Sequence, residues 1–231
     1  DKININKFNI LLSRRLSNEP ISKIINKKSF WKDDFFVNQF VLDPRPETES
    51  IIEESLKIIK NKKAKLRILD IGTGSGSIAI SLAREFNNAE IIAIDISDEA
   101  IKVANTNITK KKLQNRIELK KGSIDSIKSK FDLIVSNPPY LSKNEIKETS
   151  IEVKNFEPKI ALYGGEDGLY FYKEFAIKIA NIMNKNAHMI LEIGENQLNS
   201  CKQIFSFSGL NLLKKTQDLQ KKDRIMVFSK L

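Results

Sequence analysis

Residues 132–140 constrain the fold more than any other stretch, because both a core strand and its end can be read from them. Residues 133–135, Leu-Ile-Val, form a short apolar run that is typical of a strand buried on both faces. Two prolines follow Asn137 directly, and proline has no N–H with which to continue a sheet. The pattern predicts that Asn137 lies just beyond the carboxyl end of a core strand, where open α/β sheets bind ligands.

The Asn-Pro-Pro-Tyr segment at 137–140 also carries suitable chemistry for a binding site. The amide of Asn137 offers one acceptor and two donors, and Tyr140 adds a flat aromatic wall. Such a site suits a planar group that carries an NH2, either an amide or the exocyclic amine of a base. Taken alone, the same four residues are equally compatible with a rigid turn.

A second signal follows the strand predicted at 67–71. Its exit reads Asp-Ile-Gly-Thr-Gly-Ser-Gly at 70–76, and a helix is predicted at 77–86. A strand, a glycine loop and a helix in this order are the context of a nucleotide site, because glycines let the backbone approach a ligand. The spacing is neither that of dinucleotide folds nor that of a P-loop. Asp70 would attract a cation, such as the ammonium or sulfonium of S-adenosylmethionine.

A third signal is Asp95, which ends the strand predicted at 90–95. A carboxylate in this position can accept hydrogen bonds from both hydroxyls of a ribose. Ser97 then caps the next helix. Further strands are predicted at 116–120, 189–193, 211–214 and 224–228, the last two as a hairpin.

The alternation of strands and helices predicts an α/β fold. We expect a Rossmann-like, mostly parallel sheet of seven strands with a C-terminal antiparallel hairpin, preceded by a short helix and a β-hairpin. The expected division places a helical linker, or the remnant of an N-terminal helical domain, at 1–28. The main domain is expected at 29–231 and includes the hairpin and substrate-side segment at 29–46.

The N-terminal helix is predicted from Ile5, Phe8, Leu12 and Leu16, which recur every three or four residues. Its apolar stripe is expected either to pack on the main domain or to belong to a helical domain that this chain lacks. Pro46 suits the first turn of a second helix, predicted to run to residue 60. The segment before that helix is placed so that it could cover a cofactor.

Composition narrows the function classes. The net charge of +10 permits an anionic partner, although the lysines are scattered. Cys201 is the single cysteine and His188 the single histidine, so no metal site is predicted and His188 is expected to be structural. Residues 1–6 resemble no signal peptide and no apolar run reaches the roughly 20 residues of a membrane span, so we expect a cytoplasmic protein without membrane contact.

Taken together, the glycine loop, Asp95 and the Asn-Pro-Pro-Tyr segment resemble the class I S-adenosylmethionine-dependent methyltransferases. Within them the chain resembles the release factor glutamine methyltransferase family (HemK-like), over residues 14–228. The segments that carry this closer resemblance are Arg15-Leu16, Glu19-Pro20, Pro-Arg-Pro-Glu-Thr-Glu at 44–49, Phe-Glu-Pro at 156–158, Ala161-Leu162, Gly-Gly-Glu-Asp-Gly at 164–168, Glu-Ile-Gly at 192–194 with Gln197, and Asp218 with Arg224.

The resemblance implies methyl transfer from S-adenosyl-L-methionine to the side-chain amide nitrogen (N5) of the glutamine in the Gly-Gly-Gln loop of class 1 peptide-chain release factors, the proteins of translation termination. It implies catalytic roles for Asn137, Pro138 and Tyr140, which together with Pro139 also form the substrate site. The implied cofactor site consists of Asp70, Gly72, Thr73, Gly74, Ser75, Gly76, Asp95, Ile96, Ser123, Ile124 and Asn137. Ser123 replaces an acid that is frequent in the family, so the adenine contact is expected from a backbone group and Ile124.

Two other functions remain open. A DNA or RNA adenine or cytosine amino-methyltransferase would share the Asn-Pro-Pro-Tyr segment, but it must flip a base, and the chain leaves little room for a target-recognition region. A cofactor-binding partner subunit without catalysis is disfavoured by Asn137 and the glycine loop. We expect a monomer without stable nucleic-acid binding.

Overall fold

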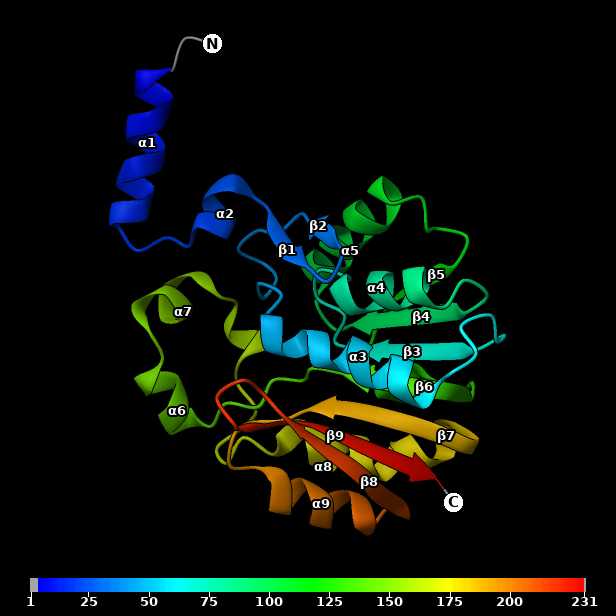
Figure 1. The fold of residues 1–231 in the computed structure, drawn as a ribbon. Coiled ribbons are helices and arrows are strands. Elements are labelled where there is room, and N and C mark those ends of the chain that lie inside the picture. The colour runs from blue at the N-terminus through cyan, green and yellow to red at the C-terminus, as the bar shows by residue number, and fades with distance from the viewer. Residues whose placement is uncertain (1–3, 231) are drawn as a thin grey trace.

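The computed structural model describes residues 4–230, and one sheet of seven strands forms its centre (Figure 1). The strand order is β5-β4-β3-β6-β7-β9-β8, and β9 runs antiparallel to the other six strands. The predicted fold is therefore confirmed. The strands are β3 (Arg67–Ile71), β4 (Glu90–Asp95), β5 (Ile117–Lys121), β6 (Phe131–Ser136), β7 (Met183–Glu192), β8 (Leu210–Gln217) and β9 (Asp223–Lys230).

Helices cover both faces of this sheet because its central strands are apolar on both sides. In β6, Leu133 and Val135 point into one core and Ile134 points into the other. The first core also receives side chains of α3 (Glu49–Ile58), α4 (Ser77–Glu85) and α5 (Asp98–Lys110). The second core receives those of α8 (Tyr170–Ile179) and α9 (Leu198–Ser206).

The connection from β6 to α8 is long and carries two short helices, α6 (Lys143–Glu148) and α7 (Ile151–Phe156). Ser142 and Glu145 form a capping box at α6, and Ser150 caps α7, so both starts follow from local side chains. Single 3-10 turns complete the chain at η1 (Pro46–Thr48), η2 (Ile124–Ser126), η3 (Lys159–Ala161) and η4 (Ala180–Ile182).

The predicted hairpin is present as β1 (Lys28–Phe30) and β2 (Asp33–Phe35). Phe30 and Phe35 are buried in the core that contains α3 and α4, so the hairpin packs on the main domain. Several predicted boundaries were wrong: those of α4 and β5 by one residue, and those of β8 and β9 because both strands are longer than predicted. Strand β7 begins six residues before the predicted position, and α3 ends at Ile58 rather than at residue 60.

The first helix, α1 (Ile5–Leu16), spans the predicted residues, but it has no buried side chain. Ile5, Phe8 and Leu16 are exposed, and Figure 1 shows α1 standing apart from the sheet. Of the two alternatives expected for its apolar stripe, packing on the main domain is therefore wrong. By contrast, α2 (Ile21–Ile25) buries Lys23 and Ile24 and belongs with the structure that follows it.

Within residues 4–230, none of the helices has both the length and the apolar character that crossing a membrane requires.

Because α1 buries nothing, deletion of residues 1–16 should leave the stability of the remaining chain nearly unchanged. The ion pair between Arg15 and Glu152 is exposed and the one between Arg14 and Glu19 is only partly buried, and ion pairs at a protein surface contribute little to stability. We expect the Tm to change by less than about 4 °C, which corresponds to roughly 1 kcal/mol in a chain of this size.

The matched control for this deletion is Phe30→Ala in the hairpin, where a buried ring is lost. This substitution should cost roughly 3 to 5 kcal/mol and lower the Tm clearly. Thermal unfolding followed by circular dichroism measures both. A deletion that lowers the Tm as much as Phe30→Ala would show that α1 is part of the main folding unit.

Candidate active site

A cavity of about 440 Å³ opens at the carboxyl ends of β3, β4 and β6. Three sides come from the loops that leave these strands and β5, and a fourth side comes from residues 40–45 and Thr48, which precede α3. The remaining side is mainly apolar, with one carboxylate at Glu174, and comes from η3 and α8. Its lining residues are Ile160, Ala161, Tyr170, Phe171, Glu174 and Phe175.

The cavity brings together most of the residues predicted for the site. It is lined by Gly72, Thr73, Gly74, Ser75, Asp95, Ile96, Ser123, Ile124, Asn137, Pro138 and Pro139. Three predicted residues, Asp70, Gly76 and Tyr140, are not among the lining residues. The segment before α3 lies over the cavity as the sequence indicated.

The glycine loop leaves open space in front of its backbone. Gly72 and Gly74 have φ values of 73° and 54°, which favour glycine over other residues. A Cβ atom added at either position would meet nothing within 4 Å. The backbone of this loop is therefore accessible to a molecule in the cavity.

Asp70 lies beneath the loop rather than in the cavity wall. Its Oδ2 accepts a hydrogen bond of 2.6 Å from the Thr73 hydroxyl, while its Oδ1 has no hydrogen-bond partner. Burial raises the pKa of Asp70 to about 7. This carboxyl braces the loop from below, and its predicted attraction for a bound cation stays a prediction.

The Asp95 carboxylate fixes the loop that follows β4 and can still accept hydrogen bonds from a ligand. Its Oδ2 accepts from the N–H of Gly74 and its Oδ1 accepts from the N–H of Ser97, each at 2.9 Å. An ionised carboxylate offers about four lone-pair directions, so both oxygens can accept further hydrogen bonds. Burial raises the pKa of Asp95.

Ser123 and Ile124 form the start of η2 after β5. Ser123 Oγ donates to Asp125 Oδ2 at 2.9 Å, and the Ile124 side chain is buried in the core that contains α8. The position that is frequently acidic in the family is thus occupied by a hydroxyl that bonds within its own turn.

Asn137 belongs to a buried polar chain behind the cavity. Its Nδ2 lies 3.1 Å from Thr48 Oγ1, and the Thr48 hydroxyl donates to Glu192 Oε2 at 2.6 Å. The Tyr140 hydroxyl donates to Glu192 Oε1 at 3.3 Å. Burial raises the pKa of Glu192 to about 7, and it also raises the pKa of Tyr140.

The sequence predicted neither Thr48 nor Glu192 as a site residue. Both lie in segments that carry the family resemblance, and Glu192 ends an otherwise apolar stretch of β7 that follows His188. A charged residue at the carboxyl end of a core strand was the available signal, as it was for Asp95.

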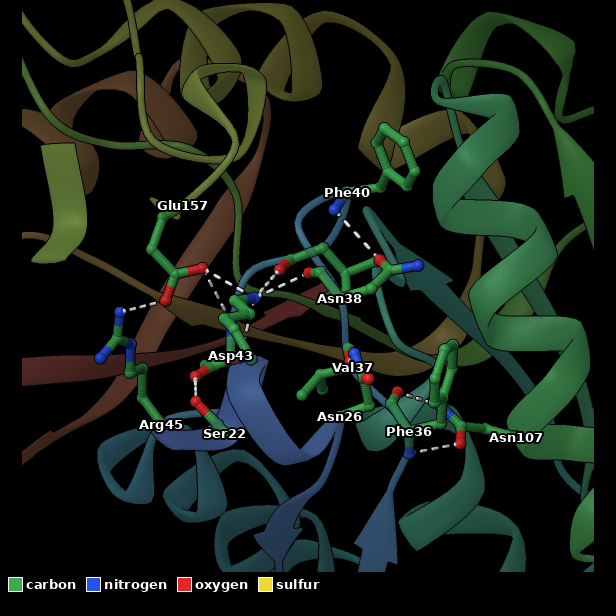
Figure 2. A network of polar contacts seen from close by, with 12 residues as sticks. Ser22, Asn26, Phe36, Val37, Asn38, Phe40, Asp43, Arg45, Asn107 and Glu157 are labelled. Carbon is green, nitrogen blue, oxygen red and sulfur yellow. Dashed lines mark hydrogen bonds and ion pairs between the residues drawn. The ribbon is translucent and has the colours of Figure 1, made fainter. Parts of the chain in front are cut away.

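The segment over the cavity is fixed by a cluster of charged side chains (Figure 2). Lys23 Nζ lies 2.8 Å from Asp43 Oδ1 and 3.2 Å from Glu157 Oε2, and all three side chains are buried. Arg45 Nη2 donates to Glu157 Oε1 at 2.8 Å. Burial raises the pKa of Glu157. The cluster joins α2, the covering segment and the end of α7.

In the part of the chain that the structure describes, no three His, Cys, Asp or Glu side chains gather in a way that could hold a metal ion. His188 lies in β7 between Leu133 of β6 and Ser229 of β9, and burial lowers its pKa. Cys201 is buried, and its burial raises the pKa of the thiol to about 12.

Comparison with known proteins identifies the family. Residues 62–163 match a model described as a methyltransferase domain. The chain is 38% identical to a release factor glutamine methyltransferase from Caulobacter vibrioides, over 95% of this chain and 76% of that protein. This chain belongs to the release factor glutamine methyltransferase family. A second member, from Thermodesulfovibrio yellowstonii, is 37% identical over 95% of this chain and 80% of its own length.

Other relatives are longer. A bifunctional methyltransferase from Rickettsia typhi is 41% identical over 97% of this chain but only 47% of its own length. The chain thus spans about half the length of such relatives.

Solved structures agree with the family. A release factor-specific protein-(glutamine-N5) methyltransferase from Alicyclobacillus acidocaldarius is 26% identical, with a TM-score of 0.50 over 81% of this chain and 93% of that one. A methyltransferase from Pyrococcus furiosus shares the fold, with a TM-score of 0.65 at 20% identity over 95% of this chain and 97% of that one.

Substitution of Asp95 by alanine should weaken binding of S-adenosylmethionine by roughly 1 to 3 kcal/mol, the range for hydrogen bonds to a charged group. The control is Asp98→Ala, which removes an exposed carboxylate that pairs with Lys121 outside the cavity. Isothermal titration calorimetry measures both dissociation constants. An unchanged constant for Asp95→Ala would show that this residue only supports the loops.

Proposed function

We propose that this chain transfers a methyl group from S-adenosyl-L-methionine to the side-chain amide nitrogen (N5) of the glutamine in the Gly-Gly-Gln loop of class 1 peptide-chain release factors. The observation that carries the proposal is the place of Asn137. In a chain of this family, its amide and the Pro138 residue line one cavity together with an open glycine loop.

The residues present fit the cofactor. The open backbone at Gly72 and Gly74 can lie against the amino-acid part of S-adenosylmethionine, and Asp95 retains acceptor capacity for the ribose hydroxyls. Ile96, Ser123 and Ile124 are proposed to enclose the adenine. When bound, the cofactor supplies an electrophilic methyl group on a positively charged sulfur.

The chain's own task is to orient a poor nucleophile. The lone pair of an amide nitrogen is delocalised into the carbonyl, so a strong general base would gain little before transfer. We propose that the Asn137 side-chain oxygen accepts one N–H of the substrate and the Pro138 carbonyl accepts the other. These acceptors hold the nitrogen in line and stabilise the positive charge that develops on it.

Tyr140 and Pro139 take different parts in this proposal. Pro139 lines the cavity and walls the substrate amide. Tyr140 was predicted to stack on the amide, but its hydroxyl contact with Glu192 favours a supporting place behind Asn137. Asp70 and Gly76 likewise support the glycine loop from outside the cavity wall.

The proposal extends to the surroundings of the enzyme. Release factors act at ribosomes, so we propose a cytoplasmic enzyme. All residues of the proposed site come from one chain, so a monomer suffices.

Methylation of a base in DNA or RNA is the rival function, and the net charge of +10 is the observation in its favour. A base must be extruded at a cost of a few kcal/mol, whereas a glutamine on a loop enters the cavity directly.

The proposed substrate is tested with labelled cofactor. Purified chain, cofactor and a class 1 release factor should give a labelled release factor, because its loop presents a primary amide. The control is the same release factor with the loop glutamine replaced by alanine, which should stay unlabelled. Equal labelling of both would exclude the glutamine, and labelling of DNA or ribosomal RNA instead would favour the rival function.

The role of Asn137 is tested by Asn137→Ala, which removes a proposed acceptor for the substrate amide. Methyl transfer should fall by about two orders of magnitude or more, while cofactor affinity falls only modestly. The control is Asn88→Ala, because Asn88 is exposed and precedes β4 at the opposite edge of the sheet. Turnover and calorimetry measure the two effects. Near-normal turnover of Asn137→Ala would contradict the proposed role.

A further inference from the structure

We infer that Thr48 and Glu192 are positioning residues that orient the side-chain amide of Asn137, so that its oxygen faces the substrate and its NH2 group points inward. This inference rests on the proposed function, because the substrate in question is an amide. It gives a role to Thr48, which lines the cavity, and to Glu192, which is not among the lining residues. The sequence predicted neither as a site residue.

The orientation follows from a count of protons. A threonine hydroxyl carries one proton, and an ionised carboxylate can only accept. Thr48 Oγ1 lies 2.6 Å from Glu192 Oε2, a short distance that is typical of a hydroxyl bonded to a carboxylate. The proton of Thr48 is therefore directed at Glu192, and the Thr48 oxygen can only accept from its other neighbour.

That other neighbour is Asn137. Its amide lies 3.1 Å from Thr48 Oγ1, and of its two polar atoms only the nitrogen can donate. The NH2 group must therefore face Thr48, which leaves Oδ1 for the cavity. In the reverse orientation two NH2 groups, one from Asn137 and one from the substrate, would face each other without a hydrogen bond between them.

Glu192 meets charged and polar groups from several elements. Thr48 and Glu47 belong to η1, Tyr140 follows β6, and Arg224 lies on β9, which pairs with β7. Thr48, Tyr140 and Arg224 favour the ionised carboxylate, whereas burial and Glu47 oppose it. Arg224 also donates to Asp218 at 2.9 Å, so Asp218 shares its positive charge. The balance leaves Glu192 titrating near neutral pH, with a pKa of about 7.

Protonation of Glu192 would remove the constraint. A protonated carboxyl can donate to Thr48, and the Thr48 hydroxyl is then free to donate to the oxygen of Asn137. The amide could then turn, and its oxygen would no longer face the substrate. Methyl transfer should therefore fall as the pH falls through about 7.

The first test separates this role from simple packing of η1 on the sheet. Thr48→Val keeps the shape but lacks the hydroxyl, and Thr48→Ser restores the hydroxyl. At saturating cofactor and release factor, kcat of Thr48→Val should fall roughly 10- to 100-fold, and Thr48→Ser should stay within about threefold of the unmodified chain. KM for the cofactor should change little in either.

The control is Ser55→Ala, which removes a buried hydroxyl on the neighbouring helix α3. Ser55 Oγ donates only to the carbonyl of Ile51 in its own helix, so kcat should be unchanged. If Thr48→Val and Thr48→Ser give the same kcat, the hydroxyl does not orient Asn137 and the inference is overturned.

The second test uses the pH profile of Glu192→Gln. The unmodified chain should lose kcat as the pH falls through about 7, while Glu192→Gln should show a lower kcat without this acid limb. Asp70 has a similar pKa, and its titration could change the affinity for the cofactor. The cofactor is therefore kept at a saturating concentration, so that a change in affinity does not alter the measured kcat. An acid limb that persists in Glu192→Gln would overturn the inference.

A third measurement does not depend on the identity of the substrate. The Nδ2 protons of Asn137 can be followed by NMR in 15N-labelled protein and assigned with Asn137→Asp. They should exchange with water more slowly in the unmodified chain and in Thr48→Ser than in Thr48→Val. Equal exchange rates would overturn the inference, even if release factor proved not to be the substrate.

Discussion

The site depends on the pairing of two strands that are far apart in the sequence, β3 and β6. Ile71 of β3 and Ser136 of β6 are register partners, and the buried Ser136 hydroxyl donates to the Ile71 carbonyl at 2.7 Å. This contact holds the ends of both strands level. Because β3 is followed by the glycine loop and β6 by Asn137, the pairing alone places the open backbone beside the amide. The sheet order also reverses at β3, which is where such folds bind ligands.

Two buried carboxyls, Asp70 and Glu192, give the site a cost in stability. Asp70 lies in β3, which ends at the cavity, and Glu192 ends β7, the neighbour of β6. Each accepts from a threonine hydroxyl at 2.6 Å, and burial raises each pKa to about 7. A carboxyl whose pKa is raised in the folded state contributes stability below its unfolded pKa, near 4, and this contribution is lost as the pH rises through 7. The ionised forms that orient Thr73 and Thr48 are thus the less favourable ones for folding.

The sequence predicted accurately those strands whose bounds are marked by a local pattern of apolar and polar residues. The bounds of β3 and β4 were correct to the residue, because each strand starts at a charged residue before an apolar run and stops at a clear signal, the glycine loop after Ile71 and the acid Asp95. The start of β7 was missed, since Asn184, Lys185 and Asn186 give it a polar first half.

Tertiary contacts explain the other misses. The sequence could not predict whether α1 packs on the main domain. Apolar residues at helical spacing show that one face of a helix is apolar, but they do not show which other element, if any, packs against that face. Thr48 and Glu192 are 144 positions apart, and their contact exists only in the folded chain.

The same segment that supplies Thr48 also supplies Asp43 and Arg45, which with Lys23 and Glu157 form a cluster of two cations and two carboxylates. Each buried charge there is offset by a neighbour, whereas removal of one would leave an uncompensated charge. A segment with two prolines, unable to join the sheet, is therefore held over the cavity by balanced charges at one end and reaches Asn137 through a single hydroxyl at the other.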